Sequence, residues 1–131
     1  MLPRNRWFVV CALVYALAGG ALGLAWLAAP GALPALAPRA HAHLMLVGFV
    51  GMMVFGIGLH ILPRFTGHPL FSERMADAQF AFANLGLLLM VAGWLAGLAL
   101  PATVGGALVW AAFLMFAINA VATVRPWARR G

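Results

Sequence analysis

From residue 78 to residue 124 the sequence runs for 47 residues without a charged side chain. As one helix rising about 1.5 Å per residue, this run would be about 70 Å long. A bilayer core is only about 30 Å thick and needs about 20 apolar residues. The run therefore predicts two membrane spans. Pro101 is the expected break between them, because a proline fits the first turn of a new helix, where its missing N–H costs little.

Two further apolar runs precede this one, at residues 7–29 and 42–62. Three prolines separate these two runs, and a polar connection over residues 63–77 follows the second. The first run is longer than the 7–15-residue core of a signal peptide, which favours a retained span. The predicted fold is thus an all-α integral membrane protein with one domain over residues 1–131. Its four spans are expected at about 7–29, 42–62, 78–100 and 102–124.

The composition agrees with lipid as the main solvent. Hydrophobic residues make up 66% of the chain and charged residues 8%, whereas soluble domains average about 25% charged residues. The net charge of +6 comes from arginines at the ends of apolar runs, where they would contact lipid headgroups, so no nucleic-acid partner is expected. A single cysteine, Cys11, excludes an internal disulfide and a cysteine-based zinc site.

The arginines also predict an orientation. With four spans, all but one of them fall on the same side of the membrane, and Arg39 falls on the other. Arginine-rich connections stay in the cytoplasm. We therefore expect a multi-pass protein of the cell (inner) membrane with both termini cytoplasmic. The arginines on the cytoplasmic side are Arg4, Arg6, Arg64, Arg74, Arg125, Arg129 and Arg130.

The second span carries histidines, and an ionisable residue at membrane depth is a functional candidate. His60 follows His43 by 17 residues, or about 25 Å along a helix, so the two cannot share one metal. His41 and His43 are two residues apart and point to opposite sides of a helix. This spacing is poor for chelating one ion and suits two separate partners. Imidazole is a common axial ligand of haem iron, but both side chains could also be plain polar residues at the interface.

The glycines and other small residues of the spans can be interpreted in two ways. The pairs Gly19/Gly23 and Gly93/Gly97 have the spacing that allows close helix packing. The second span has four glycines of its own and several methionines. These would equally make room for a flat cofactor such as a porphyrin. The residues concerned are Met45, Gly48, Gly51, Met52, Met53, Gly56 and Gly58.

Residues 40–70, AHAHLMLVGFVGMMVFGIGLHILPRFTGHPL, resemble the tenth helix of subunit I of haem–copper oxidases and the loop after it. That family has a His-x-His pair, a third histidine 19 residues after the first, then a proline, an aromatic residue, Ser or Thr, and glycine. About a quarter of the chain takes part, without a gap. The matching residues are His41, His43, His60, Pro63, Phe65, Thr66 and Gly67.

The resemblance implies haem b as the cofactor. In the family the first histidine of the pair binds the high-spin haem and the second the low-spin haem, so His41 and His43 become the metal ligands. Arg39 would pair with the haem propionates, or else contact a lipid headgroup. The oxidase core has three arcs of four spans, so this chain would correspond to one arc. The resemblance therefore implies a homotrimer with haem between neighbouring protomers.

The chain departs from the family in its chemistry. Tyr15 is the only tyrosine, and spans one, three and four have no histidine, so the copper site has no counterpart. No acidic residue lies inside a span, so the proton-relaying carboxylates are missing too. These differences argue against copper and against oxygen reduction coupled to proton pumping. No catalytic residue is assigned, and whether the chain is an enzyme stays open.

Three functions follow. The first is a b-type cytochrome with bis-histidine ligation that transfers electrons, with quinol or a small cytochrome as partner. The second is a haem protein that binds or senses nitric oxide or oxygen, since the chain loosely resembles the membrane haem–copper proteins of the nitric-oxide response. The third is a non-haem subunit binding copper or zinc. His60 is expected to be structural and bonded to a backbone carbonyl, and His68 to be solvated. Gln79, Asn84 and Asn119 are expected to join helices.

Overall fold

The computed structural model describes residues 1–125, and over these residues every regular element is a helix. Four rods are long and apolar enough to cross a membrane, which confirms the predicted all-α class and the presence of four helices of spanning length. The second rod, Ala37–Thr66, is built from three consecutive segments. Trp127, Arg129 and Arg130 lie outside the described residues. In chain order the elements are α1 (Pro3–Ala28), η1 (Pro30–Ala32), α2 (Ala37–His43), η2 (Leu44–Gly51), α3 (Met52–Thr66), α4 (Glu73–Ala96) and α5 (Ala99–Val124).

Glycines end two of the four rods. The second rod continues through Pro63 and stops at Gly67, whose φ is 69°. Likewise α4 ends at Gly97, with φ of 71°, and Pro101 lies within the first turn of α5. A glycine accepts this left-handed conformation without steric cost and so terminates a helix. The polar connection after the second rod is therefore shorter than expected, covering residues 67–72.

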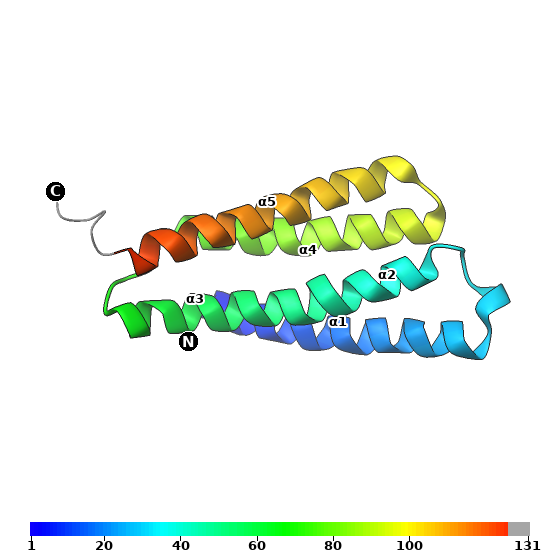
Figure 1. Cartoon of the computed structure of the whole chain (residues 1–131), viewed down its shortest axis with the longest axis horizontal. Coiled ribbons are helices and arrows are strands. Elements are labelled where there is room, and N and C mark those ends of the chain that lie inside the picture. The colour runs from blue at the N-terminus through cyan, green and yellow to red at the C-terminus, as the bar shows by residue number, and fades with distance from the viewer. Residues whose placement is uncertain (126–131) are drawn as a thin grey trace.

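The four rods form two antiparallel hairpins that lie against each other. In Figure 1, α1 runs along the rod made of α2 and α3, and α4 runs along α5. Residue 1 and the end of α5 lie at the same end of the bundle, which we call the terminal end. Arg39, near the start of α2, lies at the opposite end, the histidine end. The arginines among residues 1–125 thus have the expected distribution between the two ends.

The two hairpins meet where α2 packs against α4 and α3 against α5, and specific contacts between α1 and α4 add to this interface. The rings of Phe8 and Phe80 meet edge to face with their centroids 4.9 Å apart. The Tyr15 hydroxyl donates to the Asn84 Oδ1 atom at 2.8 Å. At the terminal end, the Arg4 guanidinium bonds the only two acidic side chains of the chain, Glu73 and Asp77, each at 2.8 Å.

The buried amides divide into two kinds. Asn119 clamps the backbone of Ser72, since it donates to the carbonyl at 2.8 Å and accepts from the N–H at 3.0 Å. Together with Asn84, it joins helices as expected. Gln79 differs, because its side chain is fully buried and neither polar atom has a hydrogen-bond partner among residues 1–125. The expectation of a helix-joining contact therefore fails for Gln79.

Candidate functional site

The candidate site lies where the second rod enters the bundle at the histidine end. Helix α2 begins at Ala37, with Pro38 in its first turn, so His41 and His43 lie in its second turn. The next eight residues, Leu44–Gly51, form a π-helix. Such wide turns are rare and occur frequently at functional sites. The histidines thus stand on a short α-helical segment, directly before an irregular part of the rod.

His41 points toward α1. Its Nδ1 atom lies 2.7 Å from the backbone oxygen of Gly19. The ring also lies so close to Gly23 that a Cβ atom there would be 2.7 Å from both Nδ1 and Cε1. Since a carbonyl oxygen can only accept, Nδ1 carries a hydrogen, and in the neutral imidazole Nε2 then keeps its lone pair. The glycine pair on α1 therefore seats the imidazole and selects its tautomer.

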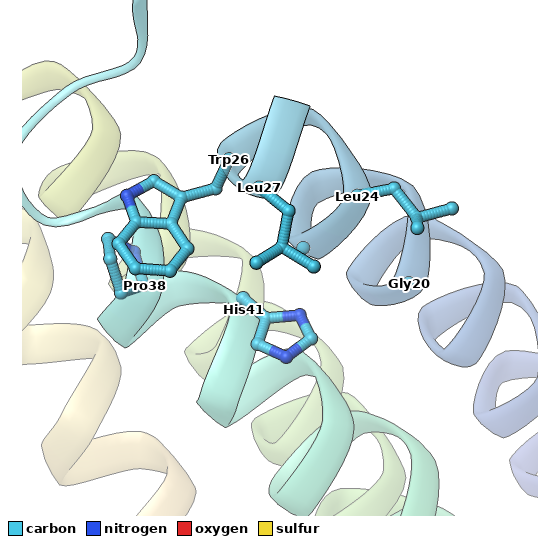
Figure 2. A pocket seen from close by; sticks show the side chains of 7 residues that line it. Gly20, Leu24, Trp26, Leu27, Pro38 and His41 are labelled. Carbon is cyan, nitrogen blue, oxygen red and sulfur yellow. The ribbon is translucent and has the colours of Figure 1, made fainter. Parts of the chain in front are cut away.

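A cavity of about 430 Å³ opens beside the His41 ring. Its walls are mainly apolar and come from the end of α1 and the start of α2. Figure 2 shows the ring on the side of Leu27, with Trp26 beside Pro38. Cofactor sites are commonly apolar pockets of about 300–1,000 Å³ with few polar groups. The complete lining is Gly20, Gly23, Leu24, Trp26, Leu27, Pro38 and His41.

His43 points to the other flank of the rod, toward α4. Its ring meets the Trp94 ring edge to face, with centroids 4.7 Å apart. Its Nδ1 atom lies 3.0 Å from the backbone oxygen of Arg39, one turn earlier. The Arg39 guanidinium carbon itself lies 5.7 Å from the centroid of the Trp94 ring. His43 thus has the same tautomer as His41, and a cation and an aromatic ring beside it.

The two histidines do not converge. His41 contacts α1 and His43 contacts α4, which is the opposite placement that their two-residue spacing requires. No group of three or more His, Cys, Asp or Glu side chains gathers to hold a metal in the described part of the chain. A ligand of either imidazole would therefore find only one histidine on that flank of this chain.

The glycines of the second span serve helix packing. A methyl group added to any of the four would meet an aromatic side chain of α1 or α5, so protein atoms pack against these positions. The structure therefore supports the interpretation that these glycines serve close helix packing. The glycines and their aromatic neighbours are Gly48 and Tyr15, Gly51 and Phe113, Gly56 and Phe8, and Gly58 and Phe116.

The remaining histidines lie at the terminal end. His60 makes no hydrogen bond with another residue of the described chain, so the expected bond to a backbone carbonyl is wrong; its side chain instead lines a second cavity. His68 is exposed in the connection after α3, as expected of a solvated side chain. Sequence reasoning missed Trp94 as the neighbour of His43 and Gly20 and Trp26 as neighbours of His41.

Comparisons with models of known families, with curated proteins and with solved structures found no match to this chain. The resemblance of residues 40–70 to the haem–copper oxidase helix therefore stays a prediction. What the fold itself establishes is a chain of four apolar helices, suited to a multi-pass membrane protein, with two oriented imidazoles at one end.

Proposed function

We propose that this chain is a membrane b-type haem protein that transfers electrons, with His41 and His43 as axial ligands. One observation carries the proposal: both imidazoles have Nδ1 beside a backbone carbonyl, at 2.7 and 3.0 Å. Metal-ligating histidines almost always donate their other ring N–H to such an acceptor, which fixes the ring and raises its basicity. In this arrangement the Nε2 lone pair of each ring is available to iron.

The surroundings of His41 suit a porphyrin. The adjoining cavity of about 430 Å³ is mainly apolar, and Gly20 and Gly23 leave the α1 side without side-chain bulk. Trp26 and Leu27 would exclude water from the ring edge. When bound, haem would supply an iron that gains and loses one electron. On the other flank, beside His43, Arg39 is exposed next to Trp94. Its positive charge would neutralise a haem propionate or else contact a lipid headgroup.

Bis-histidine ligation requires a second copy of the chain. Since His41 and His43 face opposite flanks, one haem would take an imidazole from each of two neighbouring chains. Such sharing is what a homotrimer of four-span arcs would provide, by the resemblance to the oxidase core. In the cell membrane with cytoplasmic termini, the histidine end would face outward, and quinol or a small cytochrome would exchange electrons there.

A second candidate is binding or sensing of nitric oxide or oxygen. The observation favouring it is that each flank of the chain offers a single imidazole. A haem held by one imidazole keeps an open position where a diatomic ligand binds. Binding of copper or zinc by His41 and His43 together is less well supported, since the two rings diverge.

Absorption spectra test these alternatives. The protein would be purified in detergent after haem-replete expression and measured oxidised, reduced, and reduced with carbon monoxide. A Soret band with sharp reduced α and β bands, lost in His41→Ala or His43→Ala and retained in His68→Ala, is expected for bis-histidine ligation. A shift of the entire Soret band when carbon monoxide is added to the reduced protein would favour the gas-binding alternative. A colourless protein would overturn both haem proposals.

A further inference from the structure

A second cavity of about 430 Å³ lies at the terminal end, far from the candidate haem site. This open cavity is lined by the beginning of α1, the end of α3 and the connection into α4. His60 and Arg64 lie one helical turn apart on α3 and both line it, as does the amide side chain of Asn5. Leu2, Pro3 and Leu70 contribute apolar walls. The cavity thus combines hydrogen-bond donors with apolar walls.

Arg64 brings an uncompensated positive charge to this cavity. It forms neither an ion pair nor a hydrogen bond with another of the described residues. The carboxylate of Glu73 also lines the cavity, but Arg4 binds it at 2.8 Å. The other acidic side chain, Asp77, is bound to the same guanidinium at 2.8 Å. The sequence has no further Asp or Glu, so in the described part of the chain Arg4, and not Arg64, holds both acidic side chains.

We propose that this cavity binds the phosphate of an anionic phospholipid. Arg64 would contact the phosphate, while His60 and Asn5 would donate hydrogen bonds to its oxygens or to the headgroup. The location supports a lipid over a free anion, because the cavity lies at the end of a helix long and apolar enough to cross a membrane and continues into an apolar wall. Basic pockets between spanning helices on the cytoplasmic side are known to bind anionic headgroups.

Native mass spectrometry of the full chain in detergent tests this proposal. The protein would be titrated with phosphatidylglycerol and, separately, with phosphatidylcholine of the same acyl chains. We expect tighter binding of phosphatidylglycerol, and about five-fold weaker binding of it in Arg64→Gln, the factor expected for one basic side chain near a headgroup. His60→Gln should also weaken it. Arg74→Gln is the matched control, since Arg74 is an exposed arginine of the same end that does not line the cavity.

Three results would overturn the proposal. Equal loss in Arg64→Gln and Arg74→Gln would mean that the net charge of this end, and not the cavity, attracts the lipid. Equal affinity for the two lipids would remove the role of the anionic charge. Competition by inorganic phosphate at millimolar concentration would indicate a soluble anion as the ligand. The measurement needs no haem, so its outcome is independent of the proposed function.

Discussion

Adding one methyl group at Gly23 should weaken haem binding without unfolding the protein. A Cβ atom at this position would lie 2.7 Å from the His41 Nδ1 and Cε1 atoms, whereas ordinary contacts begin at 3.4 Å. The imidazole must therefore move by about 0.7 Å. A shift of that size away from α1 stretches the 2.7 Å bond to the Gly19 oxygen beyond the usual 3.2 Å limit. In Gly23→Ala the ring thus loses the acceptor that orients it.

The expected magnitude follows from the role of that acceptor. Loss of a carbonyl partner behind a ligating histidine typically costs about 10–100-fold in metal affinity. The same hydrogen bond contributes only about 0.5–1.5 kcal/mol to the stability of the protein. Replacing glycine by alanine inside a helix stabilises the folded protein by about 1 kcal/mol. We therefore expect the haem dissociation constant of Gly23→Ala to rise about 10–100-fold while its unfolding free energy changes little.

Haem titration followed at the Soret band measures the affinity, and ¹⁵N spectra of the histidine rings report the tautomer. Gly106→Ala is the control, because a Cβ atom there would meet only the Met90 sulfur, at an ordinary 3.7 Å. This variant should bind haem like the original protein. Unchanged affinity in Gly23→Ala would refute the assignment of the Gly19-oriented ring as a ligand. An equal loss in both variants would assign the effect to helix packing in general.

Two further predictions concern the buried amides, and both are measured as unfolding free energies in mixed micelles. Asn119→Leu removes two hydrogen bonds to Ser72 and should destabilise the protein by about 1–3 kcal/mol, since hydrogen bonds between spanning helices contribute about 0.6–1.7 kcal/mol each; an unchanged value would contradict the clamp. Gln79→Met should stabilise it by about 1–3 kcal/mol, because it removes two buried polar atoms without partners. A destabilised Gln79→Met variant would instead indicate a hidden partner, such as an internal water.

The number and class of the spans could be predicted from the sequence, because apolar length in a bilayer leaves few alternatives. Helix ends were harder to predict. Pro101 lies in the first turn of a new helix as expected, but the polar connection predicted to begin at Pro63 begins only at Gly67, and the left-handed caps at Gly67 and Gly97 were not anticipated. A proline only lowers the stability of a helix that it interrupts, whereas a glycine at φ near 70° turns the backbone away from the helix path.

The site was predictable only in part. The two-residue spacing of His41 and His43 requires opposite directions, whatever surrounds the rod. Their neighbours could not be predicted, because Gly19 and Trp94 come from other spans and no periodicity relates them to the histidines. The Gly19/Gly23 spacing was a signal of close approach, yet it did not say that an imidazole would occupy the gap. Only the packing of α1 against α2 brings these groups together.

The π-helical segment Leu44–Gly51 affects which changes in chain length the protein can tolerate. A π-helix holds one more residue per hydrogen-bonded turn than an α-helix. A deletion in a regular α-helix rotates everything before it by about 100°. A deletion within this segment would instead shorten the wide turns to α-helical ones and leave His41 close to its position against α1. The second rod can therefore lose a residue here with less movement of its histidines than anywhere else between them and the glycine-packed part.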